Sequence, residues 1–138
     1  MKLTRRHTLM LAAGSAVAAM LPMRASAAAE EAIAAFTGGA EVGSGGITLT
    51  APEIAENGNT VPIAVDAPGA EAIMILAMGN PTPGVATFNF GPLAAAQSGS
   101  TRIRLAGTQD VVAIARMPDG SFVQASQEVK VTIGGCGG

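Results

Sequence analysis

Hydrophobic and polar residues alternate along much of the chain between residues 47 and 133. A two-residue period is typical of β-strands that turn one face to a core and the other to solvent. Clusters of Gly, Pro, Asn and Asp separate these stretches, as turns do in all-β domains. The pattern predicts seven strands, at residues 47–50, 61–65, 72–78, 85–90, 101–105, 111–117 and 121–133.

Three of these stretches carry further information. Residues 72–78 are apolar throughout, which predicts a central strand. Pro62 has no N–H group to donate, so it indicates an edge or the start of a strand. Asp119 and Gly120 lie between the last two stretches and are the strongest hairpin signal in the chain.

The segments outside the strands complete the fold prediction. Residues 30–36 begin with two acids and place Ile33 and Phe36 on one face, which predicts a short helix. The glycine-dense residues 38–46 predict a loop, and residues 53–59 favour a helical turn. Seven strands with turns between them predict an antiparallel immunoglobulin-like β-sandwich with a short N-terminal helix.

The first 27 residues predict an export signal that is separate from the fold. Arg5 and Arg6 precede an apolar run at residues 9–23, and Ala25-Ser26-Ala27 is a small-residue cleavage site. The run is too short and too rich in alanine to predict a membrane anchor. The arginine pair predicts the twin-arginine route, which exports folded proteins, and therefore a periplasmic protein.

Removal of residues 1–27 changes the net charge of the chain and the reactive side chains that it contains. The remaining 111 residues suffice for one domain, and they carry four basic and ten acidic side chains, a formal charge of −6. An acidic surface argues against nucleic acid and anionic membranes as partners. The only histidine, His7, leaves with the signal, so histidine-activated nucleophiles are excluded and a zinc site is disfavoured. We expect no metal site, no cofactor and no enzymatic activity of the chain itself.

The chain ends in Gly134-Gly135-Cys136-Gly137-Gly138, which contains its only cysteine. Glycine is the residue that costs most to order, so the pattern predicts a flexible arm that carries a thiol. Neither a plain disordered tail nor a buried core cysteine accounts for both the glycines and the thiol. Three extended residues would place the thiol about 10 Å beyond Ile133. The expected organisation is a signal at 1–27, a sandwich domain at 28–133 and a carrier arm at 134–138.

Two other sets of residues have simpler interpretations. Met74 and Met78 resemble soft metal ligands, but their place in an apolar run favours core packing. Arg102 and Arg104 lie two residues apart on one strand and could bind an anion. A solvated or partner-facing strand surface is the commoner arrangement for such a pair.

Several stretches resemble the SoxY family of sulfur carriers. The C-terminal stretch VKVTIGGCGG looks like the hallmark of that family, and the other similar stretches extend the resemblance over essentially the whole chain. They are found at residues 46–49, 52–62, 79–81, 85–88, 100–106 and 129–138.

The resemblance implies a role for Cys136. In the SoxY family the matching cysteine carries the substrate covalently through periplasmic thiosulfate oxidation. A SoxXA cytochrome joins thiosulfate to the thiol, and the SoxB hydrolase releases sulfate. Sulfane dehydrogenase, where present, oxidises the remaining sulfur. SoxY chains form a heterodimer with SoxZ, which implies a SoxZ-type partner for this chain.

Two alternatives belong to other classes of protein. The first is a periplasmic thiol-redox or Cu(I)-delivery protein that uses Cys136 and the methionines. The second is a structural module whose single cysteine forms an intermolecular disulfide.

Overall fold

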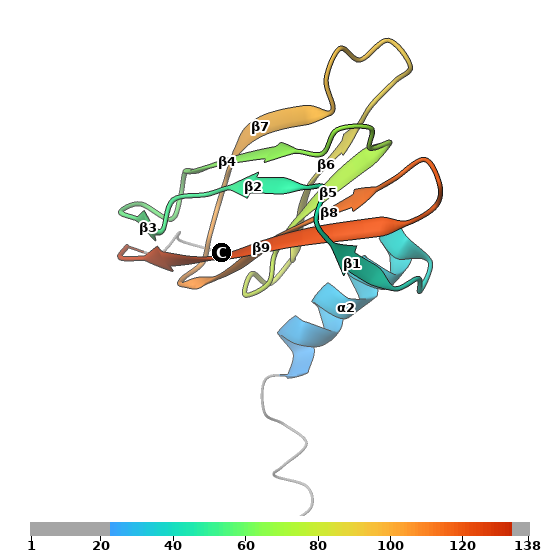
Figure 1. Ribbon diagram of the computed structural model, residues 1–138. Coiled ribbons are helices and arrows are strands. Elements are labelled where there is room, and N and C mark those ends of the chain that lie inside the picture. Colours follow the sequence, from blue (N-terminus) through green and yellow to red (C-terminus); the bar gives the residue numbers. More distant parts are fainter. Residues whose placement is uncertain (1–22, 134–138) are drawn as a thin grey trace, which may run out of the picture.

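The computed structural model describes residues 23–133, which form two packed β-sheets and one helix on the outer face of the larger sheet (Figure 1). The elements in chain order are α2 (Met23–Thr37), β1 (Val42–Ser44), β2 (Thr48–Thr50), β3 (Ile54–Ala55), β4 (Val61–Asp66), β5 (Ala72–Ala77), β6 (Gly84–Asn89), β7 (Ser98–Ile103), β8 (Gln109–Arg116) and β9 (Phe122–Val131).

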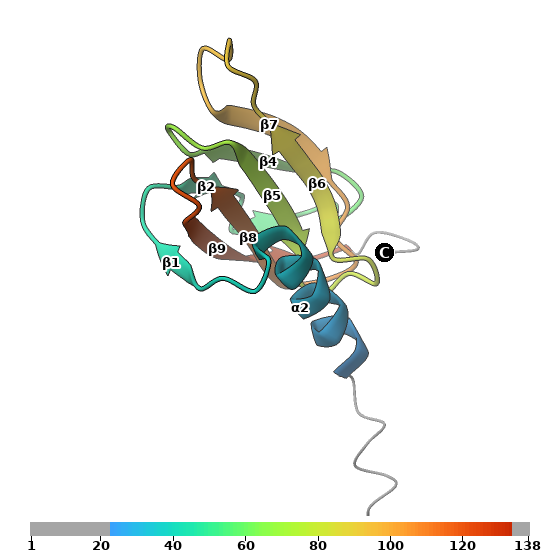
Figure 2. The ribbon, with the colours of Figure 1, turned by 90° about the vertical axis from the view of Figure 1, so that its right-hand side faces the viewer.

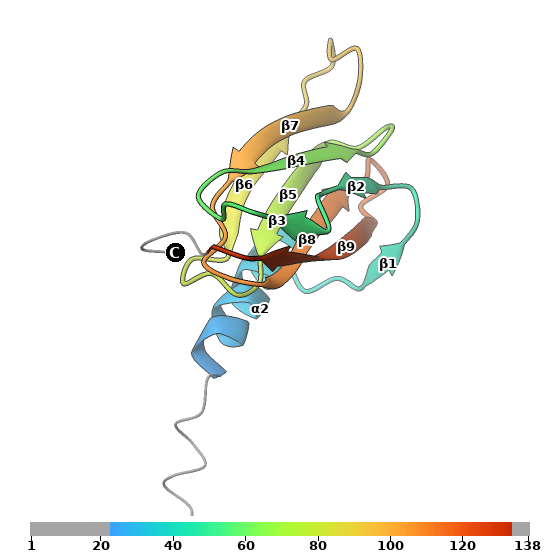
Figure 3. The same ribbon diagram turned by 90° about the vertical axis from the view of Figure 1, so that its left-hand side faces the viewer.

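The larger sheet has the strand order β1-β9-β8-β5-β6, and the smaller has the order β2-β4-β7. Neighbouring strands are antiparallel except at β9, where β1 pairs in parallel with its beginning and β3 with its end (Figure 3). The predicted antiparallel immunoglobulin-like sandwich is therefore confirmed, and the pairs of β1 and β3 with β9 are two short parallel exceptions.

All seven predicted strands are present, and β1 and β3 are additional. The predicted loop at 38–46 contains β1, and the predicted helical turn at 53–59 contains β3. Both pair with β9, far along the chain. At β3, Lys130 N–H donates to the Glu53 carbonyl at 2.9 Å and Thr132 N–H to the Ala55 carbonyl at 3.1 Å. The two or three residues of β3 and β1 show no alternation of their own, and tertiary pairing determines these strands.

β5 and β8 form the centre of the molecule because both of their faces are buried. Alternate residues, Ile73 and Ile75 among them, pack between the two sheets. The intervening residues, such as Met74 and Leu76, form a second cluster beneath α2 (Figure 2). Burial on both faces explains the unbroken apolar run, and the prediction of a central strand at 72–78 is confirmed.

Helix α2 covers the outer face of the larger sheet through Ala32, Ile33 and Phe36. The rings of Phe36 and Phe122 meet edge to face with centroids 5.8 Å apart. The Arg116 guanidinium lies 5.6 Å from the centroid of the Phe36 ring. No helix within residues 23–133 is long and apolar enough to cross a membrane.

The helix is longer than the predicted span of residues 30–36, since it begins at Met23. It therefore runs through the predicted cleavage site after Ala27. Among the helix side chains that the structure describes, Ala29, Ala32, Ile33 and Phe36 pack against the sheet or are buried, and they follow that site. Cleavage there would keep these packing residues.

Two local predictions are also confirmed. Pro62 lies near the start of β4. Strand β2 pairs only with Ala64–Asp66 of β4, so Pro62 lies outside that pairing. The β8–β9 hairpin turns at Gly120, whose φ of 85° is a conformation that glycine adopts readily. The Asp119 carboxylate accepts hydrogen bonds from the hydroxyl and the N–H of Ser121, which hold the pKa of Asp119 below its usual value.

The ring of Phe88 on β6 lies against Gly99 on β7, so it joins the edge of one sheet to the edge of the other. A Cβ atom at Gly99 would lie 2.6 Å from the Phe88 ring. Phe88 also packs against the core between the sheets. Glycine is therefore required at position 99 for this ring to close the gap between the two edges.

Replacing Gly99 with alanine is expected to lower the free energy of unfolding by about 1–3 kcal/mol, because the ring must move out of its site. Urea denaturation measures this change. Gly84→Ala on neighbouring β6 is the matched control, since nothing lies within 4 Å of its added Cβ. The control should change stability by no more than about 0.5 kcal/mol. Equal effects of the two substitutions would contradict the packing described here.

Candidate functional site

The predicted site residues Gly134, Gly135, Cys136, Gly137 and Gly138 lie outside the described residues 23–133. The structure does describe the root of the predicted arm. We define the arm root as the end of β9 and the two residues that follow it, Thr132 and Ile133.

Backbone hydrogen bonds hold the arm root to the segment 53–58 as far as the last described residue. The bonds from Lys130 and Thr132 to this segment continue the pairing of β9 with β3. Beyond them, Gly58 N–H donates to the Ile133 carbonyl at 2.8 Å. The chain is thus anchored up to Ile133, and the residues after it start from a defined point.

Side chains add two further bonds to the arm root. The Thr132 hydroxyl donates to the Glu56 carbonyl at 3.2 Å. On the β8 side, Val131 N–H donates to the Thr108 hydroxyl oxygen at 3.0 Å. The end of β9 is therefore bonded to neighbouring segments on both of its sides.

Gly58 connects the arm root to the loop between β7 and β8. It is buried, its N–H donates to Ile133, and its carbonyl accepts from Leu105 N–H at 2.7 Å. Sequence reasoning missed this role because it assigned residues 53–59 to a helical turn. The Asn57-Gly58 pair indicates a turn, but nothing in the sequence indicates its partners.

A buried pair of amides, Asn80 and Gln109, stabilises the loops at the same end of the sandwich. The Asn80 Oδ1 atom accepts from Ala106 N–H and from Gln109 Nε2, both at 2.9 Å. Asn80 Nδ2 donates to the Arg104 carbonyl at 2.7 Å, and Gln109 Oε1 accepts from Gly79 N–H at 2.8 Å. These bonds join the β5–β6 loop to the β7–β8 loop and give the arm root a well-ordered base.

Two of the three large hydrophobic side chains exposed in the described part of the chain belong to the arm root or pair with it. Ile133 is 66% exposed, and Ile54 on β3, which pairs with Lys130, is 58% exposed.

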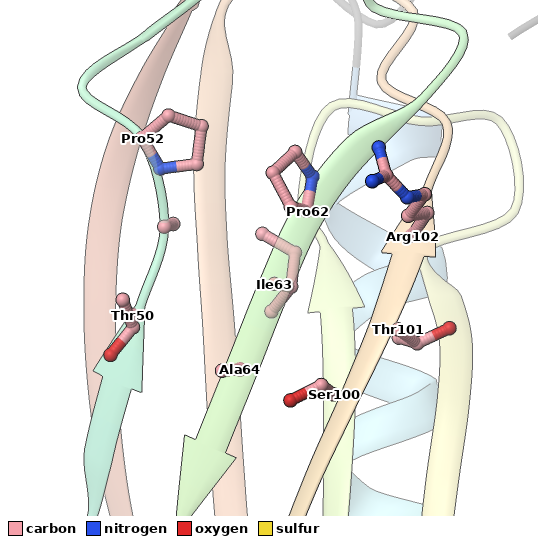
Figure 4. A pocket seen from close by; sticks show the side chains of 9 residues that line it. Thr50, Pro52, Pro62, Ile63, Ala64, Ser100, Thr101 and Arg102 are labelled. Carbon is pink, nitrogen blue, oxygen red and sulfur yellow. The ribbon is translucent and has the colours of Figure 1, made fainter.

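Arg102 and Arg104 line a groove of about 470 Å³ with residues of β6, β7 and the adjoining loops. Both side chains are exposed, in agreement with the prediction of a solvated or partner-facing surface. Arg102 also borders a second groove, of about 560 Å³, on the face of the β2-β4-β7 sheet (Figure 4). Short side chains such as Thr50, Ala64 and Ser100 line that second groove.

Two of the expectations drawn from the sequence concern metal binding. No group of three or more His, Cys, Asp or Glu side chains within residues 23–133 is placed to hold a metal ion. Met74 is buried and Met78 is half-buried in the cluster beneath α2, so the prediction of core packing for both is confirmed.

Replacing Asn80 with alanine is expected to lower the free energy of unfolding by about 1–3 kcal/mol, because buried partners of the amide lose their hydrogen bonds. Urea denaturation measures the change. Asn89→Ala is the control, since Asn89 is exposed on β6, and it should shift stability by less than about 0.5 kcal/mol. A neutral effect of Asn80→Ala would show that the amide pair does not stabilise the base of the arm.

Comparison with known proteins gives two kinds of similarity. The sulfur carrier protein SoxY from Chlorobium limicola f. thiosulfatophilum is 38% identical, with a TM-score of 0.68 over 78% of this chain and 98% of that protein. A superoxide reductase (neelaredoxin) from Ignicoccus hospitalis is 18% identical, with a TM-score of 0.56 over 64% of this chain and 81% of that one. The second similarity shows the fold alone.

No curated protein sequence matches the chain. The family model of the sulfur oxidation protein SoxY matches residues 33–136, a span that covers most of the chain and ends at the cysteine. SoxY is a sulfur carrier rather than an enzyme. The match over this span, together with the similarity to the Chlorobium protein, shows that the chain belongs to the SoxY family.

Proposed function

We propose that Cys136 carries the intermediates of thiosulfate oxidation as covalent adducts and presents them to partner enzymes in the periplasm. One observation carries the proposal. Backbone bonding holds β9 as far as Ile133, and the only cysteine lies three residues further on, between glycines. The family match that extends through residue 136 supports the assignment of this residue.

The dimensions of such an arm suit delivery to another protein. A residue spans at most about 3.3–3.6 Å, so the thiol reaches about 10 Å beyond Ile133. Because glycine has no side chain, a glycine-flanked thiol presents a narrow profile to an active-site channel. The exposed Ile54 and Ile133 give a partner enzyme an apolar surface to contact while it receives the arm.

The proposed cycle balances in atoms and electrons. The thiol and thiosulfate form a new S–S bond, with loss of one proton and two electrons that pass to a SoxXA-type cytochrome. Water then attacks the terminal sulfone in a SoxB-type hydrolase, which releases sulfate and a proton and leaves a persulfide on Cys136. A sulfane dehydrogenase, where one is present, oxidises the outer sulfur of the persulfide to a sulfonate; three water molecules supply the oxygen, seven protons are released, and six electrons pass to a cytochrome acceptor. A second hydrolysis then releases sulfate and a proton and restores the thiol of Cys136.

Within β9 and the two residues after it, Lys130 is the one cation that could activate the thiol. A thiol becomes a better nucleophile beside a cation, a helix N-terminus or a metal ion. Lys130, the nearest cation in the sequence, lines a groove with Glu53 and Glu128. Activation of the thiol is therefore assigned to the pocket of the partner enzyme, so that the carrier is inert between enzymes and reactive when docked.

A SoxZ-type subunit is the proposed stable partner. The twin-arginine signal suits a chain that is exported already folded, and a partner exported with it would explain that route for a protein with no cofactor. The Cu(I)-delivery alternative is less well supported, because Met74 and Met78 pack beneath α2 instead of facing the arm root.

Replacing Cys136 with alanine or serine is expected to abolish sulfur carriage and to leave the domain intact. Cys136 follows β9, the last described strand, in the sequence, so the free energy of unfolding should change by no more than about 0.5 kcal/mol, the range of surface substitutions. Thiosulfate oxidation with the partner enzymes and thermal unfolding measure the two effects. A large loss of stability would mean that the cysteine is packed in a core, and the carrier function would then be wrong.

Replacing Gly137 with valine is expected to reduce thiosulfate oxidation sharply, because a β-branched side chain stiffens the backbone and widens the arm. Gly135→Val should act in the same way. Domain stability should change by no more than about 0.5 kcal/mol.

A small maleimide supplies the control for this pair of variants. It should label Cys136 in both at close to the native rate, since it needs no enzyme channel. Normal turnover by both variants would show that the glycines serve only as a spacer.

A further inference from the structure

Arg102 and Arg104 are two of the three arginines that follow the predicted signal. The third, Arg116, has its Nε atom 3.5 Å from Glu71 Oε2, the only ion pair among the side chains described at residues 27–133. Neither Arg102 nor Arg104 has a carboxylate of the described residues within ion-pair distance. Their groove also exposes polar groups of Asn59, Thr82 and Thr101. The groove is therefore positively charged and lined with hydrogen-bonding groups on a domain that is otherwise acidic.

This groove lies close to the arm root. Gly58 bonds to the Ile133 carbonyl at 2.8 Å and to Leu105 N–H at 2.7 Å, so those two groups are no more than about 9 Å apart. Leu105 follows Arg104 directly, and Asn59 follows Gly58. Cys136 is three residues beyond Ile133 and reaches about 10 Å from it, and the thiosulfate adduct extends further than the thiol. The groove is thus within the reach of the arm of the same chain.

A different groove, beside the end of β9, has a different charge. It is lined by Glu53, Ile54, Gln127, Glu128 and Lys130, with two carboxylates against one ammonium group. Thiosulfate attached to the thiol ends in a sulfonate, so the cargo of a loaded arm carries a negative charge. Repulsion disfavours the acidic groove, and attraction favours the groove of the two arginines.

We propose that the groove of Arg102 and Arg104 is a resting site for the loaded arm of the same chain, and that the two guanidinium groups bind the sulfonate of the cargo. The inference rests on the proposed carrier function of Cys136. Guanidinium groups suit this role because their planar N–H donors match the oxygen atoms of oxyanions.

A carrier has to release its cargo to the next enzyme, so the groove must bind the sulfonate weakly. The exposure of the two arginines meets that condition. Both arginines are exposed, and exposed ion pairs contribute little. A short tether raises the local concentration of the cargo to the order of millimolar, which allows partial occupancy without trapping. After hydrolysis the persulfide has no sulfonate, so the arm loses its main contact with the groove when sulfate leaves.

The test uses the exported protein, labelled with ¹⁵N. Tetrathionate converts the thiol to the S-thiosulfonate and releases thiosulfate and a proton, which loads the arm without any enzyme. Methyl methanethiosulfonate makes the neutral methyl disulfide as the comparison. Intact mass confirms that each adduct is on Cys136.

The anionic adduct should shift the amide resonances of Asn59, Arg102 and Arg104, and the neutral adduct should leave them close to those of the free protein. Raising the salt concentration from 0.1 to 1 M shortens the screening length from about 10 to about 3 Å, so the shifts should largely disappear. The double variant R102Q/R104Q should lose them. R116Q removes an arginine outside the groove and should retain them.

Three results would overturn the resting site: equal shifts with both adducts, shifts that persist in R102Q/R104Q, or shifts confined to the groove of Glu53 and Glu128. Because the arm is loaded chemically, these results leave the carrier function untouched. That function fails separately, if thiosulfate turnover proceeds without Cys136.

Discussion

The account depends on the hydrogen bond between Gly58 N–H and the Ile133 carbonyl, together with the pairing of β3 and β9 that precedes it. These bonds hold the chain as far as Ile133, the last described residue, from which the proposed arm starts. Cys136 is three residues beyond Ile133, so the anchoring point would limit the reach of the thiol to about 10 Å. A carrier has to present its cargo outside its own surface while remaining attached to it, and this anchoring meets both requirements.

The rest of the fold keeps that anchoring point in place. β5 and β8 are buried on both faces, by the smaller sheet on one side and by α2 on the other. At the arm end, Asn80 and Gln109 join two loops that would otherwise contact each other only weakly. The same Gly58 that holds Ile133 also bonds to Leu105, so the arm root is connected to these loops through the backbone.

The sequence predicts the parts of the structure that depend on local patterns. The apolar run at 72–78 predicts that β5 is buried, and Asp119-Gly120 predicts the β8–β9 hairpin. Each signal lies within the segment whose structure it predicts. Sequence reasoning failed at β1 and β3, whose pairing with β9 depends on residues about 80 positions away. For the same reason it could identify the cysteine and its glycines but not Gly58, Asn80 or Gln109.

Intact-mass measurement of the protein isolated from thiosulfate-grown cells tests the central claim most directly. The account predicts a family of species that differ from the unmodified chain by added sulfur and by a thiosulfonate group, all located on Cys136. Reductant should remove every one of them. A single unmodified species, bound copper, or a permanent disulfide dimer through Cys136 would contradict the account.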